Sequence, residues 1–205
     1  MQPIEKLESE KIVAKNQIAL QTVMNKLQLI NKELSVREGR ILIHNISGRI
    51  KEPNSIKVKL RKKGCEENYE TALEVINDII GARAVCYYMD DLYLVADVLN
   101  THKDMEIIKI KNYMEHPKKT GYRSLHLIVK LMIPYGGKQE MVKVEIQLRT
   151  FAMDYWAVLD HQLRYKKENT DNDSEKIEKE LMDYADSLES IDKKMMKLRN
   201  KIAKI

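Results

Sequence analysis

Residues whose types could do chemistry together concentrate in two predicted strands, over residues 124–133 and 141–149. Side chains alternate between the two faces of a strand, so the apolar members of both segments form one face of a sheet. The opposite face then collects a carboxylate, an amide, an imidazole and two cations: Glu145, Gln147, His126, Lys143 and Arg149. Two glycines at 136–137 predict a tight hairpin turn between the strands. The same pattern also fits an antiparallel sheet with one solvated face, so further signals are needed to make it a candidate site.

One such signal is the cationic segment over residues 115–123, which precedes the first of these strands. It combines Lys118 and Arg123 with a glycine and the aromatic ring of Tyr122, which we expect to be exposed. Cations beside a ring suit a nucleotide, because charge binds phosphate and a flat face stacks on a base.

A second cationic segment spans residues 49–63 and holds seven basic residues: Arg49, Lys51, Lys57, Lys59, Arg61, Lys62 and Lys63. Asn54 is predicted to cap a helix within this segment. A solvated basic helix is the alternative interpretation. The sequence has neither a Walker-type phosphate loop nor a dinucleotide-binding glycine pattern, so side chains would hold any phosphates.

Two carboxylates complete the candidate site. Asp78 stands at the start of a predicted apolar strand over residues 79–88, and Glu145 lies on another strand. Two carboxylates from neighbouring strands can bind Mg²⁺ while leaving positions for water and phosphate oxygens. The alternative is that Asp78 is a simple cap at the start of its strand.

The elements that must position these residues lie between two long helices, one predicted at each end of the chain. The helices are predicted because apolar residues there recur at alternating spacings of four and three. The N-terminal stripe has polar Asn16 in one intervening place and otherwise consists of Val13, Leu20, Val23, Leu27, Ile30 and Leu34. The C-terminal stripe consists of Ile177, Leu181, Tyr184, Leu188, Ile191, Met195, Leu198, Ile202 and Ile205. Each stripe could pack on the chain's own core, on the other helix or on another protomer.

Between the terminal helices, the pattern predicts a mixed sheet with helices. Residues 107–110 predict a short strand, and residues 91–100 and 151–166 predict helices, the second of which leads to a polar break over 168–173. That second helix is expected to bury four apolar residues: Met153, Trp156, Leu159 and Leu163.

Composition narrows the class of protein. The 205 residues are 43% hydrophobic and 33% charged, and 36 basic against 31 acidic residues give a net charge of +5. No apolar run approaches the ~18 residues that a membrane span needs, and the acidic start is unlike a signal peptide. The two cysteines, Cys65 and Cys86, cannot make a disulfide framework. These features predict a soluble cytoplasmic protein whose modest positive charge suits polyanionic ligands or nucleic acid.

Four segments of the chain resemble, in order and spacing, the RelA/SpoT-type (p)ppGpp synthetases over about residues 45–167. The segments are Gly48 to Lys51 with Ser55 and Lys59, Asp78 to Arg83, Pro117-Lys118 with Gly121 to His126, and Val144 to Thr150. Four linked segments are far more specific than one. With long flanking helices, and with no hydrolase or regulatory domain beside them, the chain looks like a small alarmone synthetase.

The resemblance implies a fold and a reaction. The fold would be α/β (α+β), a nucleotidyltransferase-like mixed sheet flanked by helices. Residues 1–40 would form an N-terminal helical region, 41–167 the synthetase domain and 174–205 an oligomerisation helix. The reaction would transfer the β,γ-pyrophosphate of ATP to the 3′-hydroxyl of GDP or GTP with Mg²⁺ as cofactor. The terminal helices would assemble a homotetramer.

The resemblance also implies a role for each candidate residue. ATP would be bound by Arg49 and Arg83, on either side of adenine, and by Lys51, Ser55 and Lys59 near the phosphates. The guanine nucleotide would be bound by Tyr122, which stacks on the base, and by Lys118, His126 and Gln147. Asp78 and Glu145 would be the catalytic and metal-binding carboxylates: Asp78 would hold Mg²⁺, and Glu145 would bind the metal, activate the 3′-hydroxyl, or both.

Three residues depart from the pattern of the family. Asn112 and Asp160 stand where Asp and Glu are usual, and Thr120 stands where Asn is usual. These departures bear on the preferred acceptor (GDP, GTP or GMP) and on the rate. The competing hypothesis is an inactive relative that senses nucleotides or binds RNA through the same basic surface. The presence of both Asp78 and Glu145 favours the enzyme, because a pure binder needs no paired carboxylates beside phosphate.

Overall fold

The computed structural model describes residues 2–164 and 174–204, and its centre is a five-stranded sheet in the order β1-β2-β5-β4-β3. The strands are β1 Ile43–Ile50, β2 Ile80–Cys86, β3 Met105–Asn112, β4 Leu125–Tyr135 and β5 Lys138–Thr150. β2 and β5 run parallel, and the other neighbouring pairs are antiparallel. The predicted mixed sheet flanked by helices is therefore confirmed.

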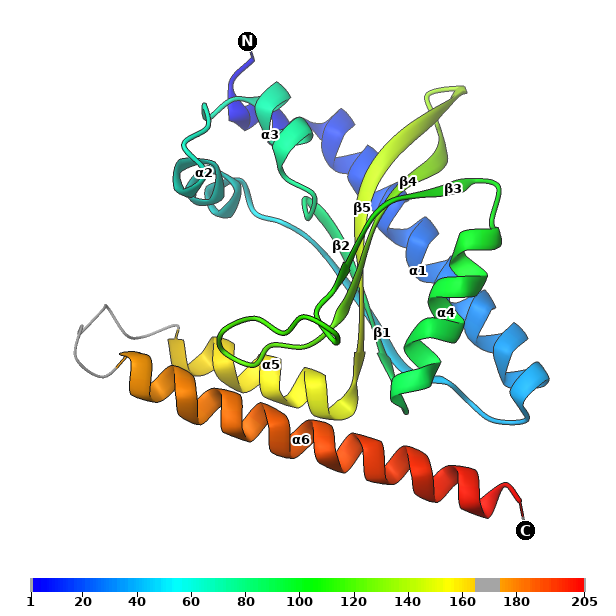
Figure 1. The fold of residues 1–205 in the computed structure, drawn as a ribbon. Helices are drawn as coiled ribbons and strands as arrows, with labels where there is room; N and C mark the ends of the chain where they lie inside the picture. Colours follow the sequence, from blue (N-terminus) through cyan, green and yellow to red (C-terminus); the bar gives the residue numbers. More distant parts are fainter. Residues whose placement is uncertain (1, 165–173, 205) are drawn as a thin grey trace.

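The helices are η1 Ile4–Glu8, α1 Glu10–Glu38, α2 Pro53–Lys62, α3 Tyr69–Val75, α4 Met89–Thr101, α5 Phe151–Arg164 and α6 Ser174–Ile202. In Figure 1, α1 and α4 lie against the sheet, α2 and α3 lie near one end of the strands, and α5 and α6 cross the other end. Within the described part of the chain, no helix is both long and apolar enough to cross a membrane.

β4 and β5 form the predicted hairpin. Gly136 and Gly137 make its turn with φ values of +59° and +75°, a left-handed conformation that glycine adopts without steric cost. The register pairs His126 with Gln147 on the neighbouring strand. Because residues two apart share a face, Glu145 also lies on this polar face, as predicted.

The apolar stripe of α1 is buried in the chain's own core. Its buried residues are Asn16, Ala19, Val23, Leu27, Ile30 and Leu34. The hydrophobic ones belong to the same cluster as the inward side chains of the strands and of α4. Asn31 adds a polar link to β1, because its side chain accepts from the main-chain N–H of Ile43 at 2.9 Å and donates to the Ile43 carbonyl at 3.1 Å. Of the partners that the sequence left open for α1, the chain's own sheet is the one observed.

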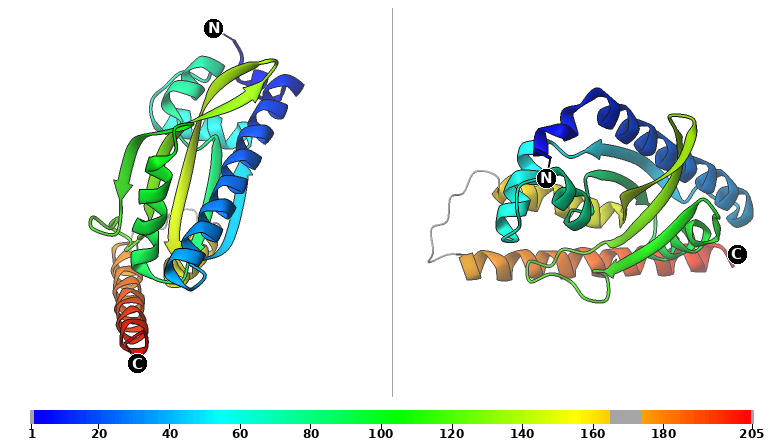
Figure 2. Two further views of the ribbon diagram at one scale, coloured as in Figure 1. Left: turned by 90° about the vertical axis from the view of Figure 1, so that its right-hand side faces the viewer. Right: turned by 90° about the horizontal axis from the view of Figure 1, so that it is seen from above.

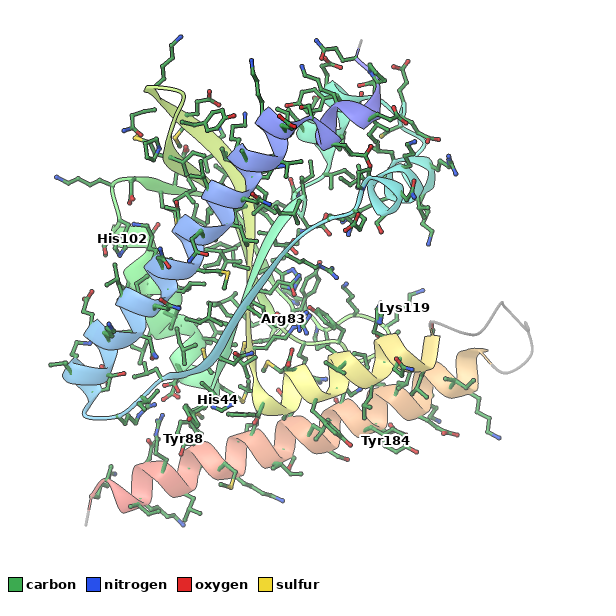
Figure 3. The ribbon with its side chains drawn as sticks, turned by 180° about the vertical axis from the view of Figure 1, so that it is seen from behind. His44, Arg83, Tyr88, His102, Lys119 and Tyr184 are labelled. Carbon is green, nitrogen blue, oxygen red and sulfur yellow. The ribbon has the colours of Figure 1, made fainter. Side chains whose placement is uncertain are left out.

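α6 lies on the opposite side of the sheet from α1 (Figure 2) and is packed beside α5. Leu181 and Ala185 are buried against Trp156. Most of the predicted stripe is nevertheless exposed, namely Ile177, Tyr184, Ile191, Met195, Leu198 and Ile202. Figure 3 shows Tyr184 on the side of α6 that faces away from the sheet. Ile205, the last member of the predicted stripe, lies outside the described residues.

Two local predictions are wrong. Asn54 lies inside the first turn of α2, and Glu52 is the N-cap. The helix starts earlier because Pro53 suits the first helical position, where its fixed φ fits and its missing N–H is not needed. Leu159 and Leu163 are 42% and 60% exposed, because the later part of α5 extends past the sheet (Figure 1). The predicted end of this helix at 166 and the polar break over 168–173 lie outside the described residues.

Candidate active site

The polar face of the sheet brings together side chains from all five strands. In the strand register, Gly81 lies opposite both Arg49 on β1 and Glu145 on β5, and Arg83 lies opposite Gln147. Between β1 and β2 the face is hollowed into a cavity lined by Arg49, Arg83 and Gln147 together with Ser47, Gly48, Gly81 and Ala82. Gly81 has no side chain, and an added Cβ there would meet only the main-chain oxygen of Arg49 at 4.0 Å, so this part of the face stays open. The structure thus places both predicted adenine-binding arginines at one cavity.

Arg83 and Arg149 share a single carboxylate at the edge of this cavity. Their Nη1 atoms lie 3.2 Å and 2.9 Å from Oδ1 of Asp154, in the first turn of α5. Burial, followed by the charge of Arg149, lowers the pKa of Arg83. Figure 3 shows Arg83 near the middle of the molecule, with Lys119 to its right in that view. Two cations around one carboxylate leave this edge positive, which suits a ligand that carries phosphates.

Asp78 is held between two lysines. The Nζ of Lys51, just after β1, lies 3.0 Å from Oδ2, and the Nζ of Lys59, on α2, lies 2.7 Å from Oδ1. Burial raises the pKa of Asp78, but the hydrogen bonds from Lys59 and Lys51 outweigh it, so the pKa lies below its usual value. Ser55 is exposed one turn before Lys59 on the same helix. Three elements thus bring the predicted phosphate-binding lysines to one carboxylate.

Glu145 is buried, with 5% exposure, and is surrounded by donors. Gln147 Nε2 donates to its Oε1 at 2.8 Å, while His126 Nδ1 and Lys111 Nζ lie 3.5 Å and 3.6 Å from its Oε2. Burial raises the pKa of Glu145, but the contacts with His126 and Gln147 and the charge of Lys111 prevail and lower it to about 2. Glu145 is therefore ionised at neutral pH. Burial lowers the pKa of His126 despite the nearby carboxylate, so its ring is neutral there.

Tyr122 is half-buried, and its hydroxyl is held by hydrogen bonds. The prediction that its ring is exposed is therefore wrong. Its hydroxyl lies 2.8 Å from Nε2 of His126 and accepts from Nη2 of Arg149 at 2.8 Å. The Nζ of Lys118 lies 4.6 Å from the centre of the ring and 4.9 Å from that of Tyr113. Burial lowers the pKa of Lys118. The residues predicted to bind the guanine nucleotide thus lie close together next to Glu145.

α6 supports the loop that carries Tyr122. Gly121 has φ +87°, and a Cβ there would lie 2.6 Å from the Cβ of Ala185 and 3.1 Å from the Cα of Met182. Beside this contact, Nη2 of Arg123 binds Oδ1 of Asp186 at 2.7 Å, and Nη1 donates to the Gly121 carbonyl at 3.0 Å. The close approach requires glycine, and it couples the position of the loop to that of α6.

Of the two predicted metal ligands, Glu145 lies on β5 and Asp78 lies just before β2, the strand that runs parallel to β5. Asp78 lies three residues before Gly81, the register partner of Glu145. Among residues 2–164 and 174–204, no group of three or more His, Cys, Asp or Glu side chains could hold a metal ion. Mg²⁺ is commonly bound through one or two carboxylates together with water and substrate phosphates. The chemistry of these two carboxylates fits that mode of binding.

Four residues of this site have no role predicted from the sequence: Lys111, Tyr113, Arg149 and Asp154. The alternation along β3 could have identified Lys111, which lies opposite His126 in the register. Arg149 lies on the predicted polar face, but its partners come from a loop, a strand and a helix. Asn112, a departure from the family pattern, accepts from the main-chain N–H of Met114 at 3.1 Å and so stabilises the turn after β3.

The fold and the polar face define a class: an α/β nucleotide-binding protein whose lysines, arginines and two carboxylates suit phosphate chemistry. A family model described as a region found in RelA / SpoT proteins matches residues 48–170. The GTP pyrophosphokinase YwaC of Bacillus subtilis (strain 168) is 38% identical over 184 residues, which cover 90% of this chain and 87% of that protein.

Solved structures agree with this class. Small alarmone synthetase 1 from Bacillus subtilis, bound to its product pppGpp, matches with a TM-score of 0.84 and 28% identity, covering 96% of this chain and 98% of that one. Small alarmone synthetase 2 from the same organism matches with a TM-score of 0.81 and 34% identity, covering 95% and 99%. The chain belongs to the RelA/SpoT family.

Proposed function

We propose that the protein is a GTP pyrophosphokinase, which transfers the β,γ-pyrophosphate of ATP to the 3′-hydroxyl of GDP or GTP and so makes (p)ppGpp. The observation that carries the proposal is an ionised, buried Glu145 on the same sheet face as the Asp78–lysine cluster. Support comes from a 38% identical relative that is a GTP pyrophosphokinase. Structures of small alarmone synthetase 1 with AMPCPP and with pppGpp support an ATP-like donor and a guanosine product.

ATP occupies the side of the face formed by β1, β2 and α2. Arg49 and Arg83 flank adenine at the cavity between β1 and β2, where guanidinium planes can stack on a base. Lys51 and Lys59 bind the phosphates, with Ser55 beside them. Both lysines already hold a carboxylate, Asp78, so phosphate oxygens can replace one charge-assisted contact with another.

The guanine nucleotide occupies the side formed by β4, β5 and the loop before β4. Tyr122 stacks on guanine, and Lys118, His126 and Gln147 line the site around it. Because Lys118 lies over the ring of Tyr122, it moves aside or toward the phosphates when the base stacks. The loop rests on α6, which gives the stacking ring a fixed support.

In the reaction, the 3′-oxygen of the acceptor bonds to the β-phosphorus of ATP. The bond from that phosphorus to the α,β-bridging oxygen breaks, and AMP leaves. Glu145 accepts the proton of the 3′-hydroxyl, a role that requires an ionised carboxylate, and its lowered pKa keeps it ionised at neutral pH. Asp78 and Glu145 would hold Mg²⁺, which neutralises phosphate charge when bound. The remaining side chains contribute mainly by positioning the two substrates.

The test of the proposal is product analysis with ATP, Mg²⁺ and each of GDP, GTP and GMP, for the wild-type protein and Glu145→Gln. The substitution keeps the shape but removes the charge, so we expect at least a roughly 100-fold loss of rate. The matched control is Glu106→Gln, on the exposed side of β3, which should keep the wild-type rate. A Glu145→Gln protein with most of its activity would remove Glu145 from the mechanism.

The RNA-binding alternative predicts different behaviour of the same lysines. Lys51 is only 15% exposed at its side chain and is paired with Asp78, an arrangement that favours a specific phosphate site over a solvated basic surface. We expect Lys51→Ala to depress turnover with every acceptor and to leave oligonucleotide affinity nearly unchanged. An RNA surface would instead lose about 0.7–0.9 log units of salt dependence for each lost phosphate contact.

We also propose that the protein is cytoplasmic and assembles as a homotetramer through its terminal helices. The support is the row of apolar side chains on α6 that the chain itself leaves exposed, from Ile177 to Ile202. An apolar row of this length that a single chain leaves exposed is usually covered by another protein surface. Self-association into a closed symmetric assembly is a common way to cover it.

A further inference from the structure

Arg149 is buried and makes several side-chain hydrogen bonds, in each of which it must be the donor. It is 6% exposed, and its Nη2 donates to the hydroxyl oxygen of Tyr122 at 2.8 Å and to Oε1 of Gln147 at 3.0 Å. Its Nη1 donates to Asp154 at 2.9 Å. A guanidinium group has donors and no acceptor, so each partner must accept at the atom that Arg149 touches.

The first consequence concerns His126. Because the Tyr122 oxygen accepts from Arg149, its own proton is free to be donated to Nε2 of His126, 2.8 Å away. Any other arrangement leaves the hydroxyl proton without an acceptor among the described residues. A neutral imidazole that accepts at Nε2 carries its proton at Nδ1. The buried Nδ1 faces Oε2 of Glu145 at 3.5 Å, the outer limit of a hydrogen bond, and has no shorter partner among the described residues.

The second consequence concerns Gln147. Since its Oε1 accepts from Arg149, its amide nitrogen is turned to the other side, where Nε2 donates to Oε1 of Glu145 at 2.8 Å. Two paths therefore start at one guanidinium nitrogen and lead to one carboxylate. The path through Gln147 ends in a hydrogen bond to Oε1 of Glu145, and the path through Tyr122 ends at Nδ1 of His126, which faces Oε2 at 3.5 Å.

We propose that Arg149 is a positioning residue that sets the direction of both hydrogen-bond paths and thereby presents two N–H donors to Glu145. Its importance for catalysis rests on the proposed function, in which Glu145 receives the proton of the 3′-hydroxyl. The hydrogen-bond directions themselves are a property of the free protein. They predict that neutral His126 is the Nδ1–H tautomer. The cause is that Arg149 donates to the Tyr122 hydroxyl, which in turn donates its own proton to Nε2 of His126.

The experiment measures the tautomer of His126 by ¹⁵N NMR in the protein free of metal and nucleotide, at a pH where the ring is neutral. The signal is assigned by its loss in His126→Asn. Because the carboxylate of Glu145 would itself favour the Nδ1–H form, the comparison uses a Glu145→Ala background, in which only the Tyr122 side directs the ring. We expect the Nδ1–H tautomer to persist in Glu145→Ala and to give way to a mixture of tautomers when Arg149→Met is added.

Two further double variants make the result specific. Arg83→Met in the same background also removes a partner of Asp154, but among the described residues Arg83 makes no side-chain hydrogen bond to Tyr122 or Gln147, so the Nδ1–H form should remain. Tyr122→Phe removes only a hydroxyl group and should produce the mixture even if Arg149→Met fails to fold. A mixture in Glu145→Ala alone, or an unchanged tautomer after loss of the Tyr122 hydroxyl or of Arg149, would overturn the proposal. These outcomes do not depend on whether the wild-type protein transfers pyrophosphate.

Discussion

The two long helices, α1 and α6, carry the same four–three spacing of apolar residues but lie in different surroundings. The stripe of α1 is covered by β1, β2, β4 and α4, and Leu27 is fully buried. The exposed members of the α6 stripe range from 38% for Ile177 to 62% for Ile202. The spacing of apolar residues thus predicts that a helix has a face to cover, but it does not predict what covers it.

The helices also differ in how they are attached. α1 is held chiefly by buried apolar area, which stabilises in proportion to the surface removed from water. It also makes directional contacts, such as the ion pairs of Lys15 with Glu140 and of Lys26 with Asp104. α6 leaves most of its apolar stripe exposed and depends more on directional contacts with the rest of the chain. Trp156 Nε1 donates to the main-chain oxygen of Leu181 on α6 at 3.1 Å, and the Thr150 hydroxyl donates to Asp192. Arg199 binds Asp90 through Nη1 and Nη2, at 3.0 Å and 2.6 Å. We therefore expect changes in α1 to affect folding, and changes in α6 to affect assembly and the acceptor loop.

The largest expected effect is that of a charge in the stripe of α1. Leu27→Asp removes a fully buried side chain and places a carboxylate in the core, so we expect a loss of more than about 4 kcal/mol in the free energy of unfolding. Chemical denaturation followed by circular dichroism measures it. Leu29→Asp, 64% exposed on the same helix, is the control and should change stability by less than about 0.5 kcal/mol. Equal effects of the two variants would contradict the assignment of α1 to the core.

The next effect should appear in α6 as a change of assembly without unfolding. Ile191 is 53% exposed in the middle of the stripe, and an aspartate there would put an unpaired carboxylate in an apolar contact between protomers. We expect Ile191→Asp to lower the mass measured by light scattering at micromolar concentration while the circular dichroism spectrum stays unchanged. Lys194→Asp, on the same helix but outside the stripe, should keep the wild-type mass. Wild-type protein that is already monomeric would exclude assembly through α6.

A third variant tests whether α6 supports the acceptor loop. Gly121→Ala would force a Cβ to within 2.6 Å of Ala185, so the loop must shift and Tyr122 with it. We expect the KM for the guanine nucleotide to rise by about 10-fold, within the 1–3 kcal/mol of a lost stacking contact, with little change for ATP. Gly64→Ala is the matched control, because Gly64 has φ +65° but an open environment. An equal rise of both KM values in Gly121→Ala would show that the loop does not serve the acceptor alone.

The smallest effect should be a dependence of α6 docking on pH. Burial raises the pKa of Asp192, and its contact with Thr150 only partly offsets this. A carboxyl group whose pKa is raised by folding costs stability when ionised, so this cost is relieved as the pH falls through the raised pKa. Asp192→Asn keeps an acceptor for Thr150 without the charge. Its melting temperature should exceed that of the wild type at pH 7–8, and the difference should shrink toward pH 4.

The control for this pH dependence is Asp97→Asn, on the exposed side of α4, which should show no such trend. A melting temperature of Asp192→Asn that is lower than the wild-type value by the same amount at every pH would mean that the carboxylate is needed in its charged form.

The sequence by itself determined the elements whose signals are local. Alternation along β4 and β5 and the glycine pair between them were enough to predict the hairpin, because side-chain direction in a strand and left-handed turn geometry depend on near neighbours. The same alternation placed Glu145, Gln147 and His126 on one face. The linked segments that resemble the RelA/SpoT synthetases led to the family to which the chain belongs, and the roles of individual site residues stay predictions.

Only the tertiary structure decided which of these groups meet and what covers each helix. The pairing of Lys51 and Lys59 with Asp78 requires the registers of β1 and β2 and the placement of α2, none of which the spacing of residues encodes. Two partners of Arg149, Gln147 and Asp154, are close to it in sequence, but the third, Tyr122, lies 27 residues away in the loop before β4 and meets Arg149 only in the fold. The burial of α1 and the exposure of α6 likewise depend on which surfaces remain free once the sheet has formed, since apolar periodicity is local and burial is a property of the whole fold.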